Sequence, residues 1–300
     1  MSAFRDIQPR SPDRFKACLI ILVFLLGSLS GHASSSDTVY QHYADLLADF
    51  VVEHDLAGDG LVSSFDYRAA LADTDTSERL AEQRRQLAMF DPDALTSRES
   101  AIAFWLNAYN FFMVAHILDN PRRGELVSSV RDYGNLFNPY RVFRRDLFDI
   151  GGRKYSLSEM ENDILLGDDF KARGWKDARV HFAVNCASVG CPPLRNVPYT
   201  ADNVEALLAE NTRRALNTPL NLRIEGNVLY LTSLFDWYES DFVEQAGSID
   251  QFIANHADPG VREGMAGTRS VRFIAYDWDL NSPQNMQRWI ESGPAGRWPR

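Results

Sequence analysis

The residues best suited to chemistry gather in one segment of this 300-residue sequence, His181 to Pro193. Cys186 follows an apolar stretch and precedes a run of small residues that ends at Cys191. Small neighbours allow a substrate to approach the thiol closely, and a thiol becomes a nucleophile when its surroundings lower its pKa. The same spacing fits a Cys186–Cys191 disulfide, or a buried cysteine that only packs. From the residues alone these three interpretations stay open.

His181 is the nearest candidate for a base that would take the proton of Cys186. Alternating apolar residues predict a strand over 178–185, in which His181 and Cys186 would point to opposite faces. The two side chains then meet only if the chain bends sharply near Asn185. The alternative interpretation of His181 is a structural histidine held by hydrogen bonds.

Asn107 and Asn110 lie three residues apart in a stretch that is apolar on almost every side. This stretch predicts a helix over about 98–118 at the centre of a globule, with both amides on one face. A buried amide needs a hydrogen-bonding partner. That partner is either the backbone or a ligand, and in the second case the amides would stabilise an oxyanion.

The surrounding pattern predicts helices first and mixed strands afterwards. No internal repeat or linker follows residue 36, so we expect one α+β domain with a central buried helix and a mixed, mostly antiparallel sheet. The order of elements is compatible, by analogy, with a papain-like or transglutaminase-like fold. The expected helices are 37–56, 68–72, 76–89, 157–166, 200–216 and 248–256; the expected strands are in hairpins over 140–157 and 222–231, at 178–185 and at 271–276.

The first 33 residues resemble a secretory signal peptide. Four basic residues precede ten consecutive apolar residues, Ala17 to Leu26, and Gly31-His32-Ala33 supplies a small-residue cleavage site. We therefore expect a periplasmic or extracellular protein that begins at Ser34, has no membrane attachment after cleavage, and forms a single domain over 34–300. An exported compartment permits disulfides.

Composition excludes several classes of partner. The net charge of −10 argues against nucleic-acid binding. The sequence contains no Walker loop, dinucleotide-binding fingerprint or zinc-protease motif, so we expect neither a cofactor nor a metal. A small molecule or a peptide is the expected substrate.

Five motif segments, taken together, resemble the domain-of-unknown-function family 547, with a motif core of about 60–281. The resemblance implies a fold and a set of motif positions, but no reaction. The segments are Ala103–Asn110, Gly151–Arg153 with Leu157–Leu165, His181–Pro193, Phe235–Tyr238 with Asp241 and Phe242, and Tyr276–Trp278 with Leu280 and Asn281.

The resemblance also implies which residues form a site, because the five segments are expected to converge on one cleft. After the motif glutamate Glu161 many relatives carry histidine, whereas this chain has Asn162; if that histidine is the family's base, the activity here is impaired. The motif residues carried over by position are Asn107, Tyr109, Asn110, Glu161, Cys186, Ser188, Asp236, Asp277 and Trp278.

Two functions follow as hypotheses. The first is a thiol-dependent hydrolase or acyl transferase that acts on an amide or acyl bond. In it Cys186 is the nucleophile and His181 the base, and the oxyanion donor is Asn107, Asn110 or backbone N–H groups of the loop 187–190. A second group binds substrate: Ser188, Tyr109, Glu161, Asp236, Asp277 and Trp278. The second is a non-catalytic binding or scaffold domain with a Cys186–Cys191 disulfide. A bond between the two sulfurs would discriminate them, because it removes the nucleophile.

Overall fold

The computed structural model describes residues 38–292, all within one unit, Ala33–Arg300. The predicted signal peptide lies outside the described residues. The elements of the first half are α2 (Gln41–Phe50), β1 (Val51–Leu56), β2 (Gly60–Phe65), α3 (Tyr67–Ala72), α4 (Thr76–Met89), η1 (Pro92–Ala94), α5 (Arg98–Asp119), η2 (Val130–Tyr133), η3 (Arg141–Arg144), β3 (Phe148–Ile150) and β4 (Arg153–Tyr155). Those of the second half are η4 (Glu159–Leu165), α6 (Asp168–Ala172), η5 (Ala178–Phe182), α7 (Val204–Leu216), β5 (Leu222–Glu225), β6 (Val228–Thr232), α8 (Leu234–Trp237), α9 (Glu239–Ala246), α10 (Ile249–His256), α11 (Pro259–Met265), β7 (Ser270–Ile274) and α12 (Pro283–Ser292).

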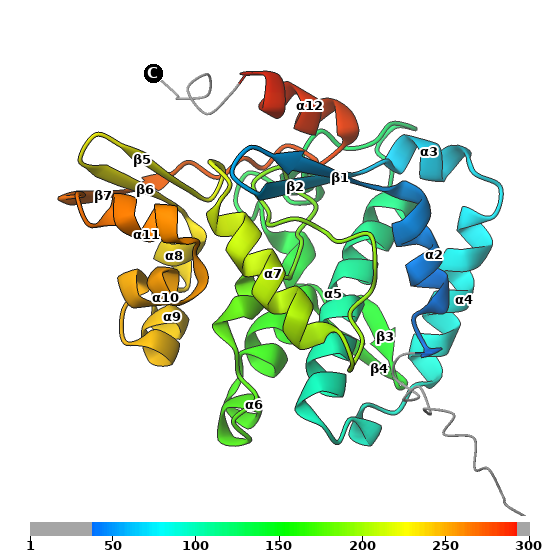
Figure 1. The fold of residues 1–300 in the computed structure, drawn as a ribbon. Helices are drawn as coiled ribbons and strands as arrows, with labels where there is room; N and C mark the ends of the chain where they lie inside the picture. The colour runs from blue at the N-terminus through cyan, green and yellow to red at the C-terminus, as the bar shows by residue number, and fades with distance from the viewer. Residues whose placement is uncertain (1–37, 293–300) are drawn as a thin grey trace, which may run out of the picture. The chain divides into compact units, whose positions relative to one another are not determined.

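The expected central helix is α5, which α3, α7 and η4 contact (Figure 1). Its N-terminus is capped by Ser97, whose side chain accepts the N–H of Ser100 at 3.1 Å. By length and composition α5 could cross a membrane, but 94% of its most apolar stretch is buried inside the protein. It is therefore the core helix of the domain.

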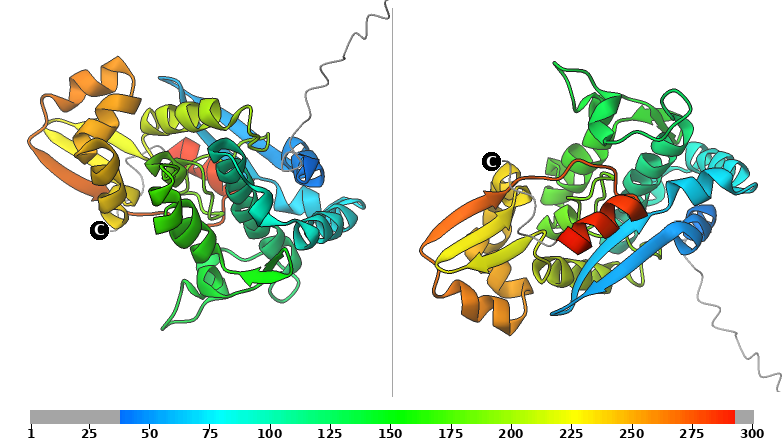
Figure 2. Two further views of the ribbon diagram at one scale, coloured as in Figure 1. Left: turned by 90° about the horizontal axis from the view of Figure 1, so that it is seen from below. Right: turned by 90° about the horizontal axis from the view of Figure 1, so that it is seen from above.

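The helix expected over 37–56 is too long: α2 ends at Phe50, and the chain continues as strand β1. The β-branched Val51 and Val52 favour an extended chain, and β1 pairs antiparallel with β2. Gly58 and Asp59 make the turn with positive φ. In Figure 2 this hairpin runs beside α12, which contacts β2.

The strand expected over 178–185 is wrong, because residues 178–182 form the 3₁₀-helix η5. The pattern misled because the polar residues that alternate with apolar ones are themselves buried and paired. Arg179 bonds Asp177, and His181 bonds Asp241. The argument that His181 and Cys186 must face apart therefore no longer applies.

The strands form three separate small sheets in the described part of the chain, where a single mixed sheet was expected. The Gly151-Gly152 hairpin is confirmed as β3–β4, but residues 141–144 are a 3₁₀-helix. The only mixed sheet among them has β5 antiparallel and β7 parallel to β6, with α8 to α11 between β6 and β7 in sequence. The α+β class is confirmed.

Candidate functional site

Asn107 and Asn110 act as backbone clamps. Asn107 donates to the carbonyl of Tyr199 at 2.7 Å and accepts the N–H of Tyr199 at 2.9 Å. Asn110 donates to the carbonyl of Ala183 at 3.0 Å and accepts the N–H of Asn185 at 2.8 Å. Both ends of each amide are thus engaged, so the oxyanion role expected for them does not fit the geometry. Their function is to fix two chain segments against α5.

The loop after Asn185 is held by a network around that side chain. Asn185 donates to the carbonyl of Pro192 at 2.7 Å, and its oxygen accepts the N–H of Ala187 and the amide of Asn281. Ala187 has a φ of 61°, an uncommon conformation for a residue with a Cβ. The network supports this conformation and fixes where Cys186 points.

Cys186 and Cys191 form a disulfide, with Cα atoms 6.2 Å apart. Of the three interpretations that the sequence left open, the structure therefore selects the disulfide. The two sulfurs differ in their surroundings. Cys186 is partly exposed, whereas Cys191 is buried. The hydroxyl of Tyr276 lies 3.4 Å from Cys186 Sγ and donates to Cys191 Sγ at 3.2 Å.

All five motif segments contribute to one cavity of about 420 Å³, as the resemblance led us to expect. The polar end of the cavity includes residues of η4, a seven-residue π-helix. Helices of this kind are rare in proteins, and those that occur are often found at functional sites. One lining residue from each segment, in chain order, is Tyr109, Glu161, Cys186, Tyr238 and Trp278.

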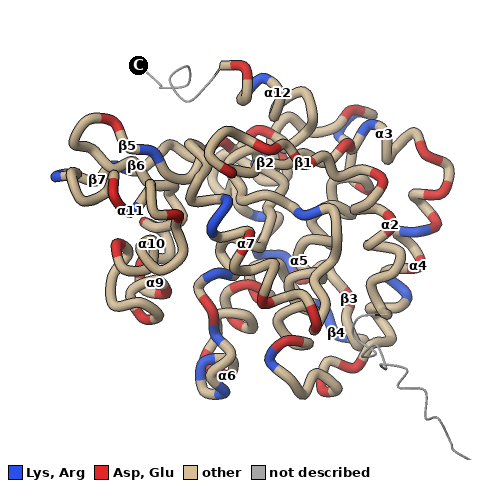
Figure 3. The backbone as a smooth tube through the Cα atoms, viewed as in Figure 1, with Lys and Arg blue, Asp and Glu red and all other residues tan. Residues whose placement is uncertain are grey.

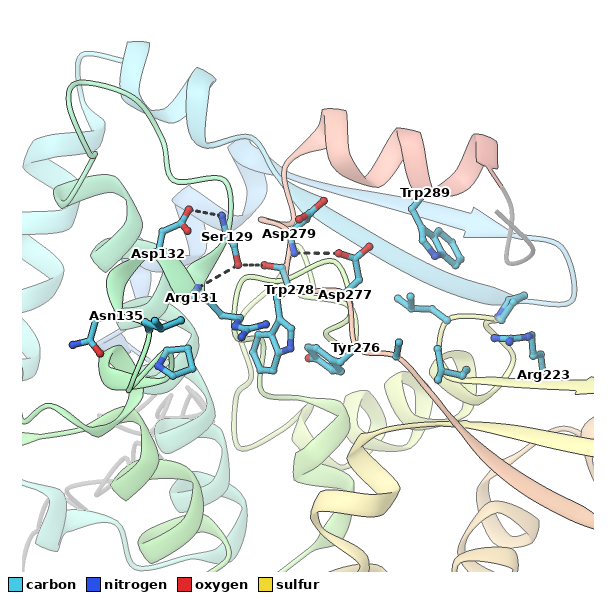
Figure 4. A pocket seen from close by; sticks show the side chains of 16 residues that line it. Ser129, Arg131, Asp132, Asn135, Arg223, Tyr276, Asp277, Trp278, Asp279 and Trp289 are labelled. Atoms are coloured by element: carbon cyan, nitrogen blue, oxygen red, sulfur yellow. Dashed lines mark hydrogen bonds between the residues drawn. The ribbon is translucent and has the colours of Figure 1, made fainter. Parts of the chain in front are cut away.

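One side of this cavity is an aromatic wall, formed by Tyr140, Trp237, Tyr276 and Trp278. Trp278 stacks on Trp237 at 5.8 Å and lies 4.6 Å from Tyr276 between ring centroids. Figure 4 shows Tyr276 and Trp278 pointing to the side opposite Asp277 and Asp279, as alternation along an extended segment requires. The wall is accessible, since Trp237 is 46% exposed.

The polar end of the cavity is built around His181, which is fully buried. Its Nε2 lies 2.9 Å from Asp241 Oδ2, and Asp241 in turn pairs with Lys176 at 2.7 Å. Its Nδ1 has no hydrogen-bonding partner among residues 38–292 and lies 3.8 Å from Glu161 Oε1. Burial lowers the pKa of His181, but the carboxylates of Asp241 and Glu161 outweigh burial and raise it.

Tyrosine hydroxyls complete the polar end. Burial, reinforced by the Glu161 carboxylate, raises the pKa of Tyr109 and of Tyr238. These hydroxyls therefore keep their protons and remain donors. Tyr238 also stacks on the imidazole of His181, with ring centroids 4.0 Å apart. Asn162, where relatives carry histidine, lines the same cavity and donates to the carbonyl of Ser158 at 3.1 Å.

Besides Asn107 and Asn110, three residues carried over from the resemblance do not line this cavity. Ser188 is buried and its backbone bridges to Leu280. Asp236 is exposed on α8, outside the residues that line the cavity. Asp277 lines a second cavity of about 640 Å³, to which Tyr276 and Trp278 also contribute (Figure 4), and its carboxylate accepts the N–H of Asp279. The second cavity is larger, but the histidine and the cysteines lie outside its lining.

Two contributors escaped sequence reasoning. Asp241 lies 60 residues from the histidine that it orients, and Tyr276 lies 90 residues from Cys186. Both fall inside motif segments, but no spacing rule connects them with their partners. Only the family resemblance pointed to their neighbourhoods.

The described residues contain no group of three or more His, Cys, Asp and Glu side chains arranged to hold a metal. Basic and acidic residues are interspersed along the described chain (Figure 3), whose sequence carries a net charge of −10. The site is therefore defined by aromatic rings, a carboxylate–histidine pair and a disulfide.

Fold and site together define an α+β domain with an aromatic, acid-containing cavity beside a disulfide. Residues 92–215 match the model of the family described as "Protein of unknown function, DUF547". The match confirms the resemblance over α5, η4, η5, the loop from Cys186 to Cys191 and most of α7. No curated protein and no solved structure gave a significant match.

Proposed function

We propose that this chain is an exported binding domain whose cavity holds a peptide segment or a small molecule that bears an amide group. The observation that carries the proposal is the lining of the cavity, with the aromatic wall on one side and Glu161 with His181 at the polar end. Binding cavities of proteins are typically apolar with a few placed polar groups. The signal-like pattern of residues 1–33 supports export.

The polar end suits an amide because it offers an acceptor beside a donor. The Glu161 carboxylate accepts a ligand N–H. The hydroxyl of Tyr238, which lines the cavity and keeps its proton, donates to a ligand carbonyl, while the buried His181 lies behind the carboxylate with Nδ1 3.8 Å from Glu161 Oε1. Hydrogen bonds with a charged partner contribute about 1.5–3 kcal/mol each. The aromatic wall then covers a planar or apolar part of the ligand.

Binding without cleavage fits the oxidised state better than acyl transfer does. The sulfur of Cys186 is bonded to Cys191 and is not a nucleophile in this state. No hydrogen bond joins His181 to Cys186 in the described chain, and the amides of Asn107 and Asn110 are used by the backbone.

A second candidate function is a thiol-dependent hydrolase or acyl transferase that is active after reduction. One observation favours it: Cys186 and His181 line the same cavity, and Asp241 orients the histidine as a triad acid would. In this function the thiolate of reduced Cys186 attacks a carbonyl carbon and His181 protonates the leaving group. Turnover of peptide nitroanilides by the reduced protein, lost in Cys186→Ala, would support it.

Titration with a panel of N-acetyl amino-acid amides, followed by tryptophan fluorescence and calorimetry, tests the binding function. Glu161→Gln keeps the shape of the side chain but removes its charge. We expect it to weaken the best ligand at least about tenfold, from the loss of a charged hydrogen bond. Glu159→Gln, two residues away and paired with Arg153 outside the cavity, is the matched control and should bind normally. Failure of the whole panel to bind, or equal affinity in Glu161→Gln, would contradict the proposal.

A further inference from the structure

We propose that Cys186–Cys191 is a site of thiol–disulfide exchange with small thiols, in which Cys186 is the sulfur attacked and Cys191 the sulfur that leaves. The proposal goes beyond ligand binding and does not depend on it, because it requires only that a thiol enters the cavity.

Access distinguishes the two sulfurs. Cys186 is partly exposed and lines the 420 Å³ cavity. Cys191 is 5% exposed and is not among the lining residues. A thiolate in the cavity therefore meets Cys186 Sγ first. Exchange requires attack on one particular sulfur, and access decides which one.

Cys191, the less accessible sulfur, accepts more hydrogen bonds than Cys186. Cys191 Sγ accepts the backbone N–H of Cys186 at 3.0 Å and that of Ser188 at 3.4 Å. It also accepts the hydroxyl of Tyr276 at 3.2 Å, a donor that lies 3.4 Å from Cys186 Sγ, so the two backbone N–H groups make the difference between the sulfurs. Donors of this kind stabilise a thiolate and make it a better leaving group. The environment of Cys191 is thus prepared for negative charge.

The backbone builds this environment. With a φ of 61°, Ala187 lies in the left-handed region, between the two residues whose N–H groups point at Cys191 Sγ. Successive N–H groups around such a residue form an anion-binding nest. Asn185 holds the turn by accepting the N–H of Ala187 at 3.0 Å. The nest is therefore a fixed feature of the loop.

The exchange balances without a further oxidant or reductant. The thiolate of a small thiol attacks Cys186 Sγ, a new mixed disulfide forms there, and the electron pair of the broken bond passes to Cys191 Sγ in the nest. The thiolate of a second small thiol then attacks the sulfur of the first small thiol in the mixed disulfide, and Cys186 leaves as a thiolate. Two small thiols are thereby oxidised to one disulfide, and the protein disulfide is reduced by two electrons.

Limiting reduced glutathione, added to the wild-type protein, tests the assignment directly. After acid quenching, peptide mass spectrometry locates the mixed disulfide. We expect it on Cys186 in at least about tenfold excess over Cys191, since only the first sulfur is accessible. A mixed disulfide mainly on Cys191 would overturn the assignment. So would the absence of any reduction under conditions that reduce an exposed disulfide in a reference peptide.

A pair of tyrosine variants tests the leaving group. Tyr276→Phe removes one donor to Cys191 and should slow reduction by glutathione at least about threefold, because the leaving thiolate becomes more basic. Tyr133→Phe removes a buried hydroxyl outside the cavity and should leave the rate unchanged. Equal rates in wild type and Tyr276→Phe would contradict the role of the nest. Amide binding is measured separately, so either proposal can fail alone.

Discussion

His181 lies between two carboxylates: its Nε2 is 2.9 Å from Asp241 Oδ2, and its buried Nδ1 is 3.8 Å from Oε1 of Glu161, which lines the cavity. Asp241 is itself held by Lys176. The imidazole therefore has a fixed plane, and its second nitrogen faces the carboxylate of Glu161. This arrangement connects the packing around η5 with the chemistry of the cavity.

Asp241→Asn should lower the pKa of His181. The carboxylate of Asp241 favours the imidazolium, and without its charge the opposing effect of burial gains weight. NMR titration of the imidazole signals measures the change. Asp236→Asn, on the exposed surface of α8, is the control and should leave the titration of His181 in place. An unchanged His181 pKa in Asp241→Asn would refute this account of the pair.

The stability contributed by His181 should depend on pH with a defined sign. Its folded-state pKa is raised above the ordinary value of 6.5. The contribution is therefore complete below pH 6.5 and is lost as the pH rises through the folded-state pKa. In urea unfolding, the difference between wild type and His181→Gln should shrink as the pH increases through this range. A difference that grows with pH would show that the histidine is neutral in the folded protein.

His116 should behave in the opposite way. Burial, with Arg145 and Arg84 nearby, lowers its pKa to about 4. Between pH 6.5 and 4, His116 is protonated in the unfolded chain but neutral in the folded protein. His116 therefore destabilises the fold as the pH falls through this range. His116→Phe should reduce the acid sensitivity of unfolding. Titration of His116 near its ordinary pKa would contradict this expectation.

Asn110→Ala should destabilise the protein by roughly 2–4 kcal/mol, because it leaves a buried N–H and a buried carbonyl without partners. Asn120→Ala, at the exposed end of the same helix, provides the comparison and should cost about 0.5 kcal/mol or less. Equilibrium unfolding in urea measures both. Equal losses would remove the clamp role from Asn110.

The signal-like pattern of residues 1–33 predicts the N-terminus of the exported protein. N-terminal sequencing of the secreted protein should begin at or near Ser34, since Gly31-His32-Ala33 forms the cleavage site. Secreted protein that still carries Met1 would contradict cleavage, and protein confined to the cytoplasm would contradict export.

Sequence patterns correctly predicted elements that local signals define, such as a capping residue, one buried face of a helix or a glycine turn. α5 with its Ser97 cap, α4, and the glycine turn of β3–β4 are examples. The patterns failed at η5, where Arg179 and His181 are buried against acidic partners, Asp177 and Glu205 for Arg179 and Asp241 for His181, so alternation did not report exposure.

The site was predictable only in part, for a similar reason. The disulfide was one of three interpretations open at the sequence level, and the five motif segments came from the resemblance. The pairing of His181 with Asp241, and of Tyr276 with Cys191, depends on tertiary contacts across 60 and 85 residues. No local rule contains that information.

The central claim is that Cys186 and Cys191 are paired in the resting protein, so that the cavity binds its ligand without cleaving it. Iodoacetamide at pH 6 to 7, followed by mass spectrometry of the mature protein isolated without reductant, tests this most directly. The account predicts no alkylation of Cys186 or Cys191 before reduction and alkylation of Cys186 after it. Rapid alkylation of Cys186 in the unreduced protein would contradict the claim and favour the thiol-dependent enzyme.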